Sequence, residues 1–118
     1  MRFIHFSAVA FALLATAACS NRPDAASVEG RWVQPIPGME QEEQGFVLEK
    51  DGAASSINMH TLLYEHWELA GERLILQGKS LGNGQTIAFS DTLLLKSVGA
   101  DSLVLQKGQL LLRYRRDG

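Results

Sequence analysis

Apolar and polar residues alternate along the chain in short runs separated by turn-forming residues. In the segment GFVLE, Phe46 and Leu48 fall on one face and Glu49 falls on the other. The segments RLILQ, DSLVLQ and QLLLRYRR alternate in the same way. Successive side chains of a β-strand point to opposite faces, so a period of two predicts half-buried strands.

Turn signals divide residues 28–116 into eight runs. Asp51-Gly52 and Asn83-Gly84 are the strongest signals, because both dipeptides suit two-residue hairpin turns that need a positive φ. The runs predict strands near residues 28–34, 44–50, 53–59, 63–69, 73–80, 86–97, 101–106 and 109–116. Short strands at this spacing are typical of an all-β sandwich or barrel.

We predict an all-β fold, a small eight-stranded antiparallel up-and-down barrel, because closure removes the exposed edges that an open sheet must protect. A barrel of this size is filled by side chains or holds one small ligand. The side chains expected to point inward are Trp32, Phe46, Leu48, Leu63, Trp67, Leu69, Leu74, Leu76, Ile87, Phe89, Leu93, Leu95, Leu103, Leu105, Leu110, Leu112 and Tyr114.

Two segments conflict with simple alternation. Residues 63–74 also fit a helical spacing, but Gly71 weakens a helix, and we predict a hairpin. In TIAFSDTLLLKS, strict alternation would place Asp91 on the inner face beside Phe89. We expect a bulge or bend at Ser90-Asp91 to turn this carboxylate away from the interior.

The first residues have a different character. Arg2 precedes an apolar stretch, Phe3 to Leu14, that has the length of a signal-peptide core and is too short to span a bilayer. Small residues follow and lead to Cys19, the only cysteine of the chain. This layout resembles a bacterial lipoprotein signal, with Thr16 at a position where that pattern prefers Leu.

The lipoprotein resemblance implies that residues 1–18 are removed and that acyl chains such as palmitate are attached to Cys19. Two or three acyl chains would hold the protein at a membrane. Ser20, where an Asp would act as a retention signal, implies the outer membrane, facing the periplasm. The alternative is ordinary secretion, which leaves Cys19 as a free thiol. Residues 19–27 are expected to be a flexible tether, and residues 28–118 the barrel domain.

The composition of the chain argues against one class of binding partner. The chain of 118 residues carries a formal net charge of −2 and has no basic run long enough to indicate nucleic-acid binding. Arg113, Arg115 and Arg116 are interpreted as a solvated strand end. With one cysteine there is no internal disulfide, so stability must come from packing.

No catalytic, metal or cofactor site is predicted. His66 and Glu68 could share a strand face, but zinc or copper needs three or four ligands, and His60 is the only other histidine after the signal. The serines Ser55 and Ser56, and Ser90 as well, show neither a GxSxG motif nor triad spacing. An enzyme is therefore not expected.

The segment WVQPIPGMEQEEQ is predicted to be an irregular loop. Its carboxylates, Glu40, Glu42 and Glu43, are interpreted as a solvated connector. Long loops in small domains often act as lids. On this hypothesis Ile36 and Met39, together with Trp32, would cover one mouth of the barrel.

The ordered set of motifs resembles the short bacterial lipocalin-like domains of secreted lipoproteins. The matching pieces are Gly30-Arg31-Trp32, Gly45-Phe46-Val47-Leu48 before Asp51-Gly52, Ala54-Ser55-Ser56-Ile57-Asn58, Trp67 before Gly71, Leu74-Ile75-Leu76, Gly82-Asn83-Gly84 and Tyr114. The resemblance implies that Trp32 plugs the closed end of the barrel. It also implies that the protein binds a small apolar molecule and performs no chemistry on it.

Two functions stay open. In the first, a hollow barrel binds a small hydrophobic ligand against side chains that are expected to be Phe46, Trp67, Phe89 and Tyr114. In the second, the core is filled and the domain is a structural or protein-interaction module, with a protein partner that the sequence does not name. Its mark would be an exposed apolar patch formed by Val47, Leu94 and Leu111.

Overall fold

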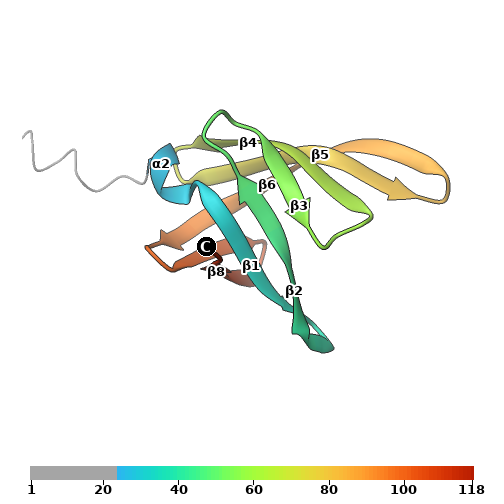
Figure 1. The fold of residues 1–118 in the computed structure, drawn as a ribbon. Helices are drawn as coiled ribbons and strands as arrows, with labels where there is room; N and C mark the ends of the chain where they lie inside the picture. Colours follow the sequence, from blue (N-terminus) through green and yellow to red (C-terminus); the bar gives the residue numbers. More distant parts are fainter. Residues whose placement is uncertain (1–23) are drawn as a thin grey trace, which may run out of the picture.

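In the computed structural model, which describes residues 24–118, one antiparallel sheet rolls into a nearly closed barrel (Figure 1). The elements are helix α2 (Ala25–Val28) and strands β1 (Gly30–Ile36), β2 (Met39–Leu48), β3 (Ala54–Ile57), β4 (Leu62–Ala70), β5 (Arg73–Gly82), β6 (Gln85–Val98), β7 (Ser102–Lys107) and β8 (Leu110–Arg116). The eight strands are ordered β3-β2-β1-β8-β7-β6-β5-β4 in the sheet. The predicted all-β fold and up-and-down barrel are confirmed.

Both predicted turns join paired strands, but only Asn83-Gly84 forms the expected two-residue turn. At Asp51-Gly52 the connection runs over residues 49–53, and of the two residues only Gly52 has a positive φ. Asn83 and Gly84 have φ values of 51° and 73°, which join β5 to β6 in a two-residue turn. Gly52 has a φ of 93°, and the Asp51 carboxylate accepts a hydrogen bond from the backbone N–H of Ala53 at 3.0 Å. Local turn chemistry therefore sets these two connections.

The predicted irregular loop between β1 and β2 is wrong. Residues 39–44 belong to β2, and Met39, Glu43 and Gln44 pair with the end of β1 across a tight turn at Pro37-Gly38, with an irregularity between Met39 and Glu43. This part of the hairpin extends from the sheet with both faces largely exposed. A strand without a buried face has no reason to alternate, so its sequence does not show the strand period. With no loop there, the lid hypothesis for Ile36 and Met39 is not supported.

One end of the barrel, called the closed end below, is built around Trp32. The one-turn helix α2 begins after Asp24, whose carboxylate accepts a hydrogen bond from the backbone N–H of Ser27 at 3.0 Å. Val28 is fully buried, and its carbonyl accepts a hydrogen bond from the Trp32 ring N–H at 2.9 Å. Residues 24–27, which we expected to be part of a flexible tether, thus form and cap this helix. Residues 1–23, with Cys19, lie outside the described residues.

Arg116 completes the closed end. Its guanidinium carbon lies 4.2 Å from the centroid of the Trp32 ring, a distance at which the positive charge is attracted to the aromatic face. The guanidinium donates to the carbonyls of Glu29 and Ala100, both at 2.7 Å. Arg116 therefore ties β8 to α2 and to the β6–β7 turn. The interpretation of this arginine as part of a solvated strand end is wrong, whereas Arg113 and Arg115 are exposed.

The barrel closes imperfectly at the seam between β3 and β4. One isolated bridge joins Ala53 to His66. Farther along the seam the side chain of Ser56 replaces the backbone ladder: its hydroxyl donates to the Leu62 carbonyl at 2.6 Å and accepts from the Tyr64 N–H at 2.9 Å. Ser56 therefore has a structural task, which explains a serine here without catalysis.

Replacing Ser56 by alanine should loosen this seam. Both hydrogen bonds disappear and two part-buried backbone groups lose their partner, so we expect a loss of about 1–2 kcal/mol in the free energy of unfolding. Urea unfolding would measure that loss, and hydrogen exchange should become faster at the Tyr64 amide. Ser55→Ala, next to it on the exposed face, is the matched control and should change little. Equal stability of both variants would contradict this account.

Most predicted inward side chains are buried or partly buried, and three are exposed. A bulge between Tyr64 and His66 shifts the alternation of β4, so Tyr64 turns inward and Leu63 turns outward. Ile87 and Leu110 keep their inward alternation but lie near hairpin tips, where no opposite wall covers them. Burial at these positions was predicted wrongly, because alternation assigns a face and not the depth of the barrel around it.

The expected bulge at Ser90-Asp91 is absent. Strand β6 pairs with β5 without interruption from Gln85 to Leu94. The irregularity lies later, between Leu95 and Ser97 in the pairing with β7. Asp91 therefore stays on the inner side of the barrel, in alternation with the buried Leu93.

Candidate functional site at the open end of the barrel

Burial falls steadily from the closed end to the opposite end. On β6, Leu93 and Leu95 are buried, Phe89 and Asp91 are partly exposed, and Ile87 is 58% exposed. On β8 the same gradient runs from buried Tyr114 through half-buried Leu112 to Leu110, which is 60% exposed. The interior is therefore packed at the Trp32 end and accessible at the other, which is called the open end below.

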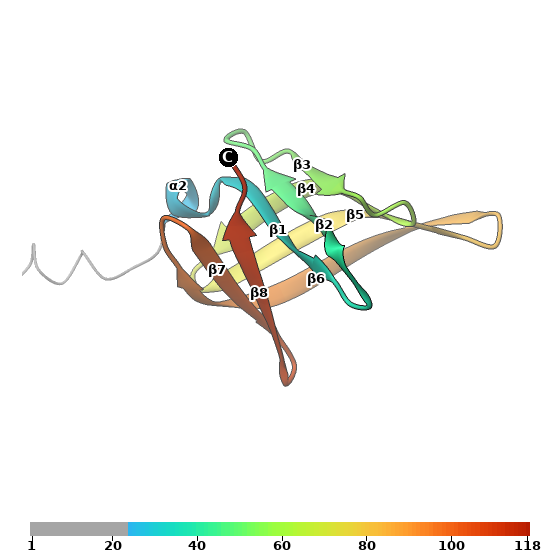
Figure 2. The ribbon, with the colours of Figure 1, turned by 60° about the horizontal axis from the view of Figure 1, so that its bottom comes forward.

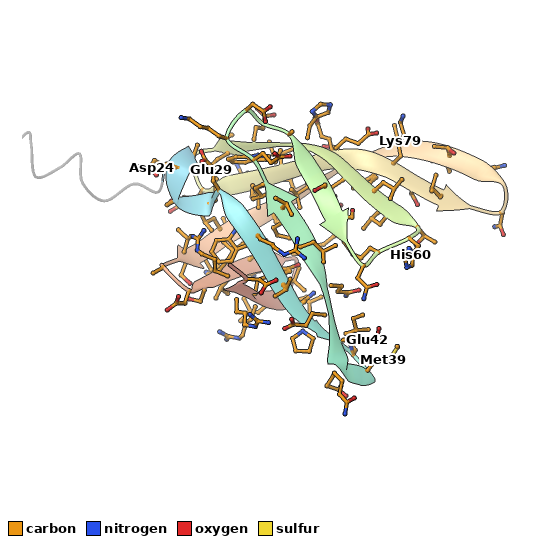
Figure 3. The ribbon with its side chains drawn as sticks, in the orientation of Figure 1. Asp24, Glu29, Met39, Glu42, His60 and Lys79 are labelled. Atoms are coloured by element: carbon orange, nitrogen blue, oxygen red, sulfur yellow. The ribbon has the colours of Figure 1, made fainter. Side chains whose placement is uncertain are left out.

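Hairpin tips form the rim of the open end. The β5–β6 arm extends beyond the barrel, and the tip of β7–β8 points away from α2 (Figures 1 and 2). Three of these hairpins carry an exposed large apolar side chain near the tip: Met39, Ile87 and Leu110. Figure 3 shows Met39 at the tip of the β1–β2 hairpin and His60 at the β3–β4 turn, away from Asp24 at the closed end.

A continuous row of aromatic rings lies below this rim. The rings of Phe46 and Tyr114 are 4.9 Å apart between centroids, and Phe46 meets Tyr64 edge-to-face at 5.8 Å. Tyr64 in turn lies 5.8 Å from Phe89. These spacings are those of favourable aromatic pairs. Four strands, β2, β4, β6 and β8, thus contribute one apolar and aromatic wall to the interior.

Tyr64 was not among the side chains predicted to point inward, and Gly78 explains its position. Tyr64 pairs with Gly78 on β5, and Gly78 pairs with Phe89 on β6. Because glycine has no side chain, the two flanking rings meet across it. A glycine inside a strand was the signal that could have revealed a close approach here.

Three of the four predicted ligand-binding residues belong to the aromatic row, and the fourth, Trp67, has a separate role. Phe46, Tyr114 and Phe89 belong to the aromatic row, through Tyr64. Trp67 instead fastens the seam, since its ring N–H donates to the Glu49 carbonyl at 2.8 Å. Its backbone N–H also donates to the Gly52 carbonyl, at 2.9 Å. Trp67 is therefore occupied in joining β4 to the β2–β3 turn.

The inner wall carries one polar pair. Lys107, in alternation with Leu103 and Leu105 on β7, places its ammonium 3.2 and 3.3 Å from the two carboxylate oxygens of Asp91. The Asp91 side chain is 30% exposed and that of Lys107 is 56% exposed. The pair lies beside the aromatic row, because Asp91 is two residues from Phe89 on the same face of β6. Burial raises the pKa of Tyr64, and the Asp91 charge adds to that shift.

Burial also raises the pKa of Tyr114 strongly above its usual value, and the nearby Tyr64 adds to the shift. In the unfolded chain a tyrosine titrates near pH 10. The folded domain therefore keeps the Tyr114 proton under conditions in which the unfolded chain loses it. The contribution to stability is complete below pH about 10 and is lost as the pH rises toward the folded-state pKa.

The alkaline stability of the domain should therefore depend on Tyr114. We expect the free energy of unfolding to fall between pH 9 and pH 11, and to fall less steeply in Tyr114→Phe, because phenylalanine has no proton to lose. Urea unfolding followed by tryptophan fluorescence at each pH would measure both slopes. The difference between the two proteins removes the contribution of lysines, which titrate in the same range. Parallel slopes would contradict the prediction.

The arrangement offers no constellation for chemistry among residues 24–118. No group of three or more His, Cys, Asp or Glu side chains lies close enough there to hold a metal ion. His60, His66 and Glu68 are exposed. The carboxylates Glu40 and Glu42 lie on the β1–β2 hairpin, beside a shallow hollow whose described lining, residues 38–42, comes entirely from that hairpin tip. No helix of this part of the chain is long and apolar enough to cross a membrane.

The proposed apolar patch is not continuous. Leu94 pairs with Gln106, and Gln106 pairs with Leu111, so a polar side chain separates the two leucines on the outer face. Val47 on β2 pairs with Arg31 on β1, the strand between β2 and β8, so a charged side chain separates Val47 from the strand of Leu111. Outer-face geometry therefore does not favour the protein-interaction alternative.

These features define a class of protein: a single antiparallel β-barrel sealed at one end by a buried tryptophan and an arginine, and accessible at the other. The profile of a family described as lipocalin-like matches residues 24–117, and the chain belongs to that family. The resemblance predicted from the motifs is thereby confirmed. Barrels of this family are generally binding folds without catalysis.

A solved structure supports the assignment. The chain is similar to the crystal structure of a lipocalin-like protein from Bacteroides thetaiotaomicron VPI-5482, with 50% sequence identity and a TM-score of 0.72. The match covers 77% of this chain and 97% of that chain. No curated protein matches the chain.

Proposed function

We propose that the protein binds one small apolar molecule in the open end of its barrel and performs no chemistry on it. The burial gradient carries this proposal. An interior filled throughout would bury Phe89 and Leu112, whereas both are partly exposed on an inner wall of aromatic and aliphatic side chains. Ligand sites are typically lined mostly by apolar side chains with a few polar groups, and the inner wall at this end has that composition.

We also propose that the mature protein is anchored to the outer membrane, facing the periplasm, through acyl chains on Cys19. The support is the sequence pattern of residues 1–19. Helix α2 begins at Ala25, which leaves only residues 20–24 between the proposed anchor and the helix. So short a connection would hold the domain close to the membrane, where apolar molecules are concentrated.

Native mass spectrometry tests the binding proposal. Residues 20–118 contain every described strand, and the solved relative has nearly all of its own length matched within this chain, so this fragment is expected to fold. The fragment would be produced in a bacterial periplasm and sprayed intact. Extra mass that is removed by organic solvent would identify a bound apolar molecule. A bare polypeptide, with no uptake of added fatty acids, alcohols or amines, would overturn the proposal.

Anchoring needs a separate experiment on the full chain. Growth with an alkyne-tagged palmitate should label the unchanged protein, and Cys19→Ser should abolish the label and release the protein from the membrane fraction. Labelling that persists in the variant would contradict a lipid on Cys19.

A further inference from the structure

We infer that the open end selects apolar molecules that carry one positive charge, and that the Asp91 carboxylate pairs with that charge. The inference rests on the proposed function and names the class of ligand. Its starting point is the presence of a carboxylate on an inner wall where alternation would otherwise place a hydrophobic side chain.

Stability does not explain this carboxylate. The pairing of β6 with β5 holds Asp91 inward, and its one ion pair among the described residues is with the half-exposed Lys107. Ion pairs with exposed partners contribute little to the free energy of folding. An apolar side chain here would gain burial beside Phe89 and Leu93. The Asp91–Lys107 pair therefore makes better sense as a recognition element than as part of a core.

Of the two charged groups, Asp91 is the one placed to select a ligand. Its side chain is short, emerges from the middle of a long strand and is 30% exposed. Lys107 ends β7 beside the turn at Gly108, has a long flexible stem and is 56% exposed. A lysine of this kind can move its ammonium into water at little cost. A cationic ligand would then take its place opposite the carboxylate.

The surrounding side chains also favour a cation. Tyr64 and Phe89 lie 5.8 Å apart on the same wall, and the negative faces of aromatic rings attract cations. The proximity of Asp91 to this pair is reflected in its effect on the pKa of Tyr64. On the rim, Glu40 and Glu42 add negative charge near the start of β2. Figure 3 labels Glu42 there. Lys79, on the β5–β6 arm, is paired with Glu65 at 3.7 Å.

Three ligands with the same alkyl chain and different head groups distinguish the effect of charge from that of apolar burial. Decylamine, decanol and decanoic acid would be titrated calorimetrically into residues 20–118 at pH 7, below their aggregation concentrations. We expect decylamine to bind at least about tenfold more tightly than decanol, as one charge-assisted pair allows, and decanoate to bind most weakly. In Asp91→Asn the preference for decylamine over decanol should fall to within about twofold, while decanol binding persists.

Two further variants sharpen the test. Glu68→Gln removes an exposed carboxylate elsewhere on the barrel and should leave the order unchanged. Lys107→Met frees the Asp91 carboxylate and should raise the affinity for decylamine. If Asp91→Asn does not fold, two results still test the selection of cations. They are the order of the three affinities in the unchanged chain and the change in decylamine affinity in Lys107→Met.

The outcomes separate this inference from the proposed function. Equal binding of the three ligands, or tightest binding of decanoate, would overturn the selection of cations and leave the apolar site standing. If a folded Asp91→Asn kept the same preference for decylamine over decanol, a group other than Asp91 would bind the positive charge. That result also overturns the inference. Binding of none of the three would overturn both.

Discussion

Replacing Trp32 by alanine should lower the free energy of unfolding by about 3–5 kcal/mol, the usual cost of removing a buried aromatic side chain. Trp32 is fully buried, so the change leaves a cavity at the closed end. It also leaves the Val28 carbonyl without the ring N–H, and the Arg116 guanidinium without its aromatic partner. Chemical denaturation of residues 20–118 would measure the loss.

A double-mutant cycle would show that Trp32 and Arg116 act together. Arg116→Ala should also be strongly destabilising, because the part-buried bonds to the Ser27 and Glu29 carbonyls at α2 are lost, together with the exposed bond to the β6–β7 turn. Neighbours in one network are not additive, so the double variant should lose less than the sum of the single losses. Arg113→Ala, exposed on the same strand, is the control and should stay within about 0.5 kcal/mol. Strict additivity would contradict a coupled closure.

Alanine at Gly45 or at Gly78 should be as damaging, although it adds one methyl group. A Cβ at Gly45 would lie 1.8 Å from the Trp32 carbonyl oxygen, and one at Gly78 would lie 1.9 Å from the Leu63 carbonyl oxygen. Both obstacles are backbone atoms of the paired strand, so relief requires the strands to separate. We expect losses of about 3 kcal/mol or more, at the upper end of the cost of overpacking, or failure to fold.

Matched glycines make this prediction specific. Nothing lies within 4 Å of a Cβ built at Gly82 or at Gly99, and neither has a positive φ. Alanine at these two positions should therefore stay within about 0.5 kcal/mol of the unchanged chain. Comparable effects at all four positions would mean that backbone freedom, and not the close approach of two strands, explains the glycines.

The two close-approach glycines also connect stability with the site. At Gly78 the missing side chain is what allows the rings of Tyr64 and Phe89 to meet. A variant that folds with a side chain there would separate these rings. Ligand binding should then weaken even where folding is rescued at low temperature.

Period-two alternation predicted most of this fold. Strands such as β5 and β7 have one face in the core and one in solvent, and Leu74, Leu76, Leu103 and Leu105 are fully buried as their spacing predicts. The Asn83-Gly84 turn was predictable because its positive φ values demand those residues. The inward position of Arg116 could also have been predicted, since it lies two residues after Tyr114 and so falls on the same inner face of the strand.

Tertiary structure was needed wherever a position depends on a neighbouring strand. The bulge after Tyr64 depends on how β4 registers with β5, and it exchanged Leu63 for Tyr64 on the inner wall. Conversely, Asp91 followed the alternation that we had set aside, because its uninterrupted pairing with β5 left no residue to bulge out. A local pattern does not contain the register of two strands.

Depth within the barrel was likewise invisible from the chain alone. Ile87 and Leu93 share one face of β6 and one chemical character, yet one is 58% exposed and the other 4%. The difference arises because β6 outruns β7 near Leu94 and continues as a two-stranded arm. Residue chemistry along the chain was enough to predict strands, turns and an inner face. Which inner-face positions are sealed and which stay open depends on how far each strand extends past its neighbours, and only the assembled barrel sets that.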